Sequence, residues 1–201
     1  MKLYMSPASP FARKARIIIR ELDLTRLVEE IPVSPAASEE LRKVNPLGKI
    51  PALILDDGST IVDSFVIAEY LDDLAGGGKL FPASGPDKWK RKTEHSILQG
   101  MLEAMLLCRY EKMLRPEEKR WQTWYDDQWD RAWQGFALFE ARPETFARQL
   151  DITQIGLVCT LGYADFRFPD CGWRKAFPKT AAFHEKMLQR PSIKDTVPPP
   201  A

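Results

Sequence analysis

Ser9 and Pro10 stand where a predicted strand, residues 2–5, passes into a predicted helix, residues 10–22. Serine is a favoured N-cap and proline is favoured at the first helical position, so the pair indicates a helix start. The serine hydroxyl would lie beside backbone N–H groups that have no partner within the helix, and such a place stabilises an anion. The pair therefore has two interpretations: a cap alone, or a cap that also stabilises a bound anion such as a thiolate.

The energy that such a cap supplies is close to what a thiolate needs. A hydrogen bond and the helix dipole each contribute on the order of 1 kcal/mol. Lowering a thiol pKa from about 8.5 by two units requires roughly 2.7 kcal/mol. Ser6, in the same turn, is a second candidate hydroxyl, and Tyr4, on the preceding strand, is a third. We rank Ser9 first because it is in the capping position.

The segment Asn45-Pro-Leu-Gly-Lys-Ile-Pro51 leads into a predicted strand, residues 51–55. Its Ile-Pro bond is a candidate for the cis form, which only about 5–6% of such bonds adopt in folded proteins. A cis bond would expose the backbone N–H and C=O of Ile50 for pairing with an extended, peptide-like ligand. Lys49 could contact a ligand carboxylate, but for a lysine considered alone solvation is the better interpretation.

Asp63 and Ser64 follow a predicted hairpin and begin another predicted helix, residues 64–74. Either side chain could simply cap the first turn of that helix. Alternatively, Ser64 and the helix N-terminus would bind a carboxylate while Asp63 binds an ammonium group. The second interpretation describes a site for the end group of an amino acid.

The elements that must position these residues alternate over the first eighty positions. They are strand 2–5, helix 10–22, strand 27–33, a short helix from Ser38 to Val44, strands 51–55 and 59–62, and helix 64–74. The first strand–helix–strand unit predicts a parallel pair with a right-handed crossover. Asp56-Asp57-Gly58 predicts an antiparallel hairpin between the last two strands.

The remainder of the chain has a helical pattern. Residues 75–86 hold four glycines and two prolines, which continue neither a helix nor a strand favourably. Beyond them, the predicted helices are 86–114, 117–141, 151–163 and 179–189. We expect an α/β domain over residues 1–78, a linker over 79–86 and an all-α domain over 87–201. The aromatic stripe of the second of these helices is interpreted as core packing.

Composition excludes several classes of partner. The net charge of +1 gives no electrostatic reason to expect binding to nucleic acid or to an anionic membrane. No apolar stretch approaches the roughly 20 residues of a membrane helix, and no signal peptide is recognised. Three cysteines without a CxxC, and His95 and His184 without ligand spacing, favour neither disulfides nor a metal site. A cytoplasmic location is expected.

Three segments together resemble the cytosolic glutathione S-transferase superfamily, of bacterial type. They are Ser9-Pro-Phe-Ala-Arg-Lys-Ala-Arg-Ile, Asn45-Pro-Leu-Gly-Lys-Ile-Pro-Ala-Leu and Asp63-Ser-Phe-Val-Ile-Ala-Glu-Tyr-Leu, and the resemblance covers nearly the whole chain. It implies a thioredoxin-like N-terminal domain (βαβαββα), an all-helical C-terminal domain, a homodimer, a role in detoxification, and reduced glutathione as co-substrate without a metal.

By this resemblance, the backbone of Ile50 pairs with the cysteinyl unit of glutathione beside a cis Pro51. Lys49 reaches the glycyl carboxylate, and Asp63 and Ser64 hold the γ-glutamyl end. These roles agree with the interpretation drawn from the residues, because a γ-glutamyl group carries both an ammonium and a carboxylate.

Ser9 would stand near the glutathione sulfur as the catalytic residue. The omega-like members of the superfamily have cysteine at this position, whereas this chain has serine. A serine cannot form a mixed disulfide, so disulfide exchange through this position is not expected.

The function predicted is that of a transferase that activates the thiol of glutathione for attack on a small apolar electrophile or a hydroperoxide. Alternatives are a glutathione-dependent isomerase or dehalogenase, and a non-enzymatic protein that uses this fold to bind partners, as stringent-starvation-type relatives do. The resemblance places four residues on the helix facing the electrophile, where packing is an equally good explanation: Met101, Met105, Cys108 and Arg109.

Overall fold

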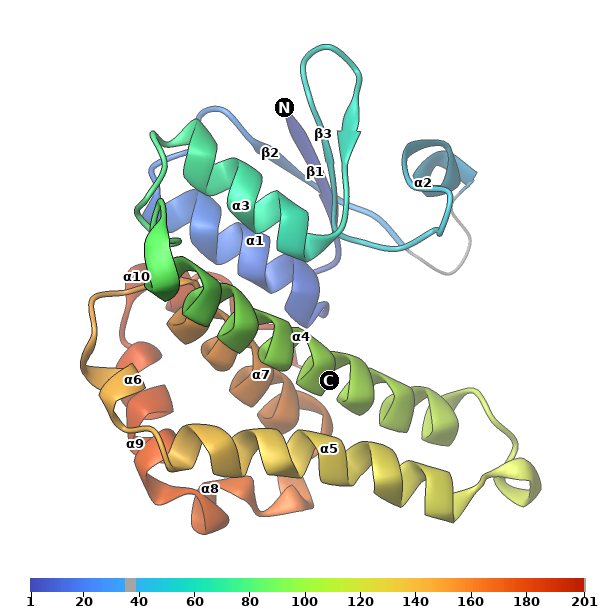
Figure 1. Ribbon diagram of the computed structural model, residues 1–201. Helices are drawn as coiled ribbons and strands as arrows, with labels where there is room; N and C mark the ends of the chain where they lie inside the picture. The colour runs from blue at the N-terminus through green and yellow to red at the C-terminus, as the bar shows by residue number, and fades with distance from the viewer. Residues whose placement is uncertain (35–38, 201) are drawn as a thin grey trace.

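The computed structural model describes residues 1–34 and 39–200 of the chain and divides into a small α/β layer and a larger helical part (Figure 1). The expected cap at Ser38 lies outside the described residues. Among the described residues, no helix has both the length and the apolar character that crossing a bilayer requires.

The N-terminal part contains a four-stranded sheet in the order β2-β1-β3-β4. Its elements are β1 (Lys2–Met5), α1 (Pro10–Glu21), β2 (Glu29–Pro32), α2 (Glu39–Val44), β3 (Ala52–Ile54), β4 (Thr60–Ile61) and α3 (Ser64–Leu74). β1 and β2 are parallel, while β3 is antiparallel to both β1 and β4. This confirms the predicted thioredoxin-like order, the parallel crossover and the hairpin.

Helix α1 lies between the sheet domain and the helical part. Figure 1 shows it beside α3, and it also packs on α7 (Ile152–Arg167). Its apolar residues Ile17, Ile18 and Ile19 are buried in the core, as the sequence pattern predicts. Because the helix is covered on two sides, two cations on it, Arg13 and Lys14, are also almost completely buried.

The C-terminal part is helical throughout, as expected. After α4 (Gly85–Met113) come η1 (Glu117–Lys119), α5 (Gln122–Glu140), α6 (Glu144–Ala147), α7, η2 (Pro169–Cys171), α8 (Trp173–Ala176), α9 (Pro178–Met187) and α10 (Pro191–Lys194). α7 is the central helix, and every residue from Ile152 to Ala164 is buried.

Several boundaries differ from the sequence-based expectation. The helix predicted from residue 117 is a 3₁₀ turn followed by α5, and the Glu111 carboxylate accepts the Trp121 N–H at 2.8 Å between them. This bond holds the chain extended at Trp121, so the helix begins only at Gln122. The four-residue helices α6, α8 and α10 were not predicted, because pieces of one turn are too short to show a periodic pattern.

Helices α4 and α5 approach each other closely at Gly135. A side chain added there would overlap the thioether of Met101 on α4. The aromatic stripe of α5 is confirmed as core at Phe136 and Phe139, which are fully buried. The interpretation as core packing is wrong for Trp121, the first residue of the stripe, because its side chain is 65% exposed.

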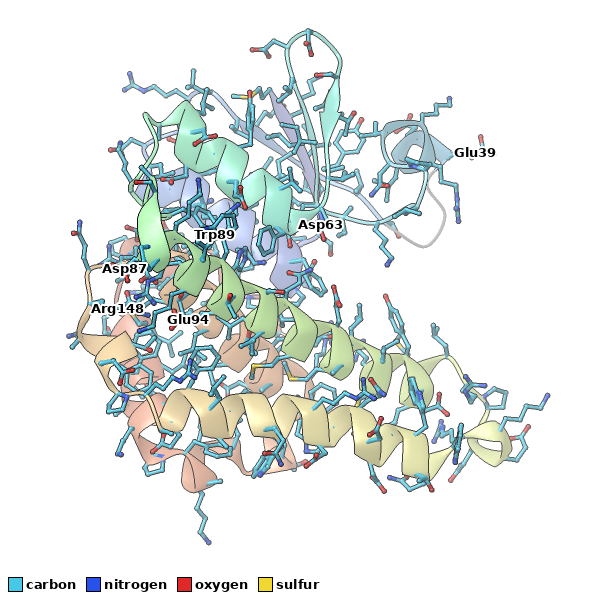
Figure 2. The ribbon with its side chains drawn as sticks, viewed as in Figure 1. Glu39, Asp63, Asp87, Trp89, Glu94 and Arg148 are labelled. Carbon is cyan, nitrogen blue, oxygen red and sulfur yellow. The ribbon has the colours of Figure 1, made fainter. Side chains whose placement is uncertain are left out.

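The first turn of α7 is fixed to α4 by a buried ionic cluster. Glu94 on α4 accepts hydrogen bonds from Arg91, from Arg148 at 3.3 Å and from Thr153 at 2.9 Å. Figure 2 shows Glu94 and Arg148 facing each other at this junction. Asp151 caps α7, as predicted, by accepting the Gln154 N–H at 3.1 Å.

Candidate active site

The three sequence segments converge on one edge of the sheet. Tyr4 at the end of β1 pairs with Ala52 at the start of β3, so the turn that holds Ser9 lies beside Pro51. β4 runs antiparallel to β3 and ends at this same edge, where it leads into Asp63. Figure 2 shows Asp63 at the end of the hairpin, beside the start of α3.

Ser9 is the N-cap of α1. Its Oγ accepts the N–H of Ala12 at 3.2 Å, and its own N–H donates to the carbonyl of Ser6 at 3.0 Å. The hydroxyl acts only as an acceptor among the described residues, so its hydrogen remains free to be donated to an anion. Ser9 is therefore confirmed as a helix cap. Because its hydroxyl hydrogen is free, Ser9 can also stabilise a bound anion such as a thiolate.

The loop before β3 is built around Asn45. This side chain is buried, donates to the carbonyl of Lys49 at 2.8 Å and accepts the N–H of Leu47 at 3.1 Å. Gly48 has a φ of +61°, a backbone conformation that glycine adopts readily. The Ile50-Pro51 bond is cis, as expected, and the Lys49 side chain is exposed.

Asp63 and Ser64 have different environments. Asp63 is exposed and caps α3, because its Oδ1 accepts the Phe65 N–H at 2.8 Å. The second carboxylate oxygen has no hydrogen-bond partner in the described part of the chain and is free to accept an ammonium group. Ser64, in contrast, is only 1% exposed, and its hydroxyl points into the protein.

The Ser64 hydroxyl is held by a polar cluster that the sequence did not indicate. It accepts a hydrogen bond from Lys14 Nζ at 3.3 Å and donates to Gln99 Oε1 at 3.3 Å. Lys14 also donates to Gln99 at 2.9 Å. These contacts join α1, α3 and α4, so the start of α3 is positioned by residues from three separate parts of the chain.

Lys14 is unusual because it is a cation without a salt bridge among the described residues. It is 1% exposed, and burial lowers the pKa of its ammonium group to about 8, against smaller opposing effects of Cys159 and Asp63. The neighbouring His95 is fully buried and stacks on Phe65 with 4.4 Å between ring centroids. Burial, assisted by the Lys14 charge, lowers the pKa of His95 to about 2 and keeps the ring neutral.

A pocket of about 550 Å³ lies farther along α4. It is bounded by the end of α4, the start of α5 and the end of α7. Of the four residues that the resemblance assigned to the electrophile side, only Arg109 lines it; Met101, Met105 and Cys108 are buried in the core. Packing is therefore the better explanation for Met105 and Cys108, whereas Met101 also lines a second pocket, of about 580 Å³, between α4 and α5.

Comparison with known proteins identifies the family. Residues 3–79 match the model of the glutathione S-transferase N-terminal domain, and residues 122–186 match that of the C-terminal domain. A glutathione transferase family member from Pseudomonas fluorescens Pf-5, solved with bound glutathione, is 40% identical, with 98% of each chain covered and a TM-score of 0.95. The chain belongs to the glutathione S-transferase family.

Two further proteins resemble it along their whole length. A glutathione S-transferase from Methylobacillus flagellatus KT, solved with glutathione bound, is 30% identical over 98% of this chain and 99% of the other, with a TM-score of 0.92. YibF, an uncharacterized GST-like protein of Escherichia coli K12, is 27% identical, and the match covers all of both chains.

Within this glutathione S-transferase fold, sequence reasoning missed Lys14, Gln99 and His95. A signal for Lys14 was present, because Lys14 stands one turn before Ile17 and Ile18, on the apolar side of a strongly amphipathic helix. Gln99 gave no such signal, since its role depends on how α4 crosses the ends of α1 and α3.

Proposed function

We propose that this protein is a glutathione transferase that binds reduced glutathione along the sheet edge and activates its thiol. The observation that carries the proposal is the convergence of Ser9, Pro51 and Asp63 at that edge. A peptide-like ligand there meets an anion-stabilising helix start, the backbone of Ile50 beside the cis Pro51, and an acidic cap. The glutathione found in the Pseudomonas fluorescens and Methylobacillus flagellatus relatives supports this choice of ligand.

In this proposal Ser9 donates its hydroxyl hydrogen to the sulfur and is not itself a nucleophile. The bound thiolate also lies in the field of the α1 N-terminus, where the first backbone N–H groups stabilise negative charge. The thiolate then attacks an electrophilic carbon, or reduces a hydroperoxide. The protein contributes orientation and electrostatic stabilisation of the sulfur anion.

The remaining contacts hold the ends of the tripeptide. The free oxygen of Asp63 accepts the γ-glutamyl ammonium, and the N–H of Ser64 at the start of α3 binds its carboxylate. The Ser64 hydroxyl takes an indirect part, because Lys14 and Gln99 hold it and thereby fix the first turn of α3. Ile50 pairs its backbone with the cysteinyl unit, and Lys49 approaches the glycyl carboxylate.

The test is a titration of the thiolate absorbance of glutathione bound to the protein. Because one hydrogen bond to a charged group contributes about 1.5 kcal/mol, Ser9→Ala should raise the pKa of the bound thiol by about one unit. Conjugation of a model electrophile should slow in parallel at neutral pH. The matched control is Ser6→Ala, which removes a hydroxyl from the same turn and should leave the thiol pKa unchanged.

Two results would contradict the proposal in different ways. If Ser6→Ala raises the thiol pKa and Ser9→Ala does not, the donor is Ser6. If calorimetry detects no heat with millimolar glutathione, the protein is not a glutathione enzyme, and the non-enzymatic, partner-binding alternative is favoured.

We also propose that the protein is a cytoplasmic homodimer. Val66 on α3 and Trp89 on α4 are 49% and 65% exposed, and the ion pair of Glu69 with Lys92, at 2.8 Å, joins the same two helices. Apolar side chains exposed next to each other favour contact with a second protein surface.

A further inference from the structure

The pocket at the end of α4 lies on the side of the molecule where Ser9 begins α1. Arg13 on α1 contacts the α7 backbone at Gly162. Ser9 is four residues, about 6 Å, before Arg13 along α1, and Arg167 is five residues, about 7.5 Å, after Gly162 along α7. Figure 1 shows α1 and α7 running in opposite senses, so both displacements are towards the same end.

Two arginines in this pocket have no acidic partner among the described residues, and the Arg167 guanidinium lies over the Phe166 ring at 3.6 Å from its centroid. Within residues 1–34 and 39–200, neither Arg109 nor Arg167 forms an ion pair or a side-chain hydrogen bond, and the Arg167 Nε is buried without an acceptor. Both influence the pKa of Tyr163, which burial raises to about 12. Two guanidinium groups near one phenol, without a carboxylate between them, form a preorganised site for an anion.

The other walls of the pocket suit an aromatic body. Tyr125, Trp129 and Phe168 line it, and Lys112 lies over the Tyr125 ring at 4.4 Å from the centroid, adding a third cation. Among the described lining residues, the acidic side chain is Asp170, which is exposed. The lining therefore combines apolar surface with an excess of positive charge.

We propose that this pocket selects an aromatic electrophile that carries a carboxylate or a similar anionic group, which Arg109 and Arg167 bind. The inference rests on the proposed function, because it assigns the second substrate of the same reaction. The anionic group is held away from the sulfur, so the reacting carbon faces Ser9. This charge is what distinguishes the substrate from the neutral electrophile expected from the sequence.

A matched pair of electrophiles tests the inference: 4-chloro-3-nitrobenzoate, which is anionic, and 4-chloro-3-nitrobenzamide, its neutral counterpart. In each, the glutathione sulfur forms a bond to the carbon that carries chlorine. The carbon–chlorine bond then breaks, chloride leaves with the electron pair, and the thiol proton passes to water. The carboxylate or amide forms and breaks no bond but changes the intrinsic reactivity of the ring, so each kcat/KM is divided by the uncatalysed rate constant of the same compound.

The expected result is a preference for the benzoate of at least about tenfold, because a hydrogen bond to a charged group is worth about 1.5 kcal/mol or more. Arg109→Met and Arg167→Met should each reduce that preference about tenfold. Arg167→Lys should retain part of the preference. The control is Arg131→Met, an exposed arginine on α5 that is paired with Asp127 and lies outside this pocket.

Equal normalised rates for the two compounds, or a preference that survives both methionine variants, would overturn the inference and leave the proposed function intact. If neither compound reacts, calorimetric titration with glutathione tests the proposed function, and titration with each compound alone tests the pocket. Tighter binding of the benzoate that both methionine variants weaken supports the inference. Equal binding, or none, overturns it.

Discussion

Lys14 is the residue whose protonation should be visible in the stability of the protein. Burial lowers its pKa to about 8 in the folded state, from 10.5 in the unfolded state. Between those values the unfolded chain holds a proton that the folded protein lacks, so stability rises with pH. One pKa unit corresponds to about 1.36 kcal/mol, so between pH 8 and pH 9.5 this group adds about 2 kcal/mol.

The measurement is urea unfolding of the wild type and of Lys14→Met at pH 7 and pH 9.5. Methionine retains most of the side-chain volume and does not titrate, so other groups contribute equally to both proteins. We expect the wild type to gain about 2 kcal/mol relative to the variant as the pH rises. A difference that stays constant between the two pH values would show that Lys14 does not change its charge in this range.

The role of a residue was predictable from the sequence where that role depends on residues close by in the chain. Ser9, Asp63 and Asp151 were all recognised as helix caps, because a cap contacts backbone two or three residues away. The cluster of Lys14 with Gln99 could not be predicted, because its members are 85 residues apart and meet only through helix packing.

At the scale of elements, the junction of α4 with α7 depends on Glu94. Its carboxylate is 2% exposed and bonds to two arginines and Thr153. Glu94→Gln would leave the buried Arg91 without full compensation of its charge, which typically destabilises a protein by about 3 kcal/mol or more. Urea unfolding should show this loss. Glu118→Gln, at an exposed position, should change stability by less than about 0.5 kcal/mol.

Hydrogen exchange shows which part of the protein the Glu94→Gln variant destabilises. If Glu94 fixes the start of α7, the amides of its first buried turn should exchange faster in Glu94→Gln than in the wild type. Unchanged stability in the variant would mean that the capping bond of Asp151 is sufficient to hold this helix end.

Whether a segment forms a helix or a strand was predicted from the sequence more reliably than the residues at which it begins and ends. The helix at α3 was predicted with its observed bounds, because Asp63 caps it and an apolar stripe continues to Leu74. α7 continues to Arg167, four residues beyond the predicted end at Tyr163. Because α7 is buried on all sides, it lacks the apolar–polar alternation from which the end of a surface helix is recognised. The sequence pattern therefore did not predict where α7 ends.

For the whole molecule, the proposed dimer makes a prediction about mass. Light scattering should give about twice the 23.0 kDa of one chain. Val66→Asp combined with Trp89→Ser should yield a monomer, because a carboxylate replaces apolar surface within the contact. Trp121→Ser is the matched control, since Trp121 is also 65% exposed but lies at the start of α5. A wild-type mass of one chain would contradict the dimer.

The long helix α4 contributes to both halves of the proposed site. Gln99 lies beneath the start of α3, and Arg109, ten residues farther along and about 15 Å away, lines the pocket. Because one continuous helix carries both, any hinge motion between the domains leaves their spacing unchanged. In the proposed site, a change to a longer or shorter co-substrate then requires substitutions inside the pocket.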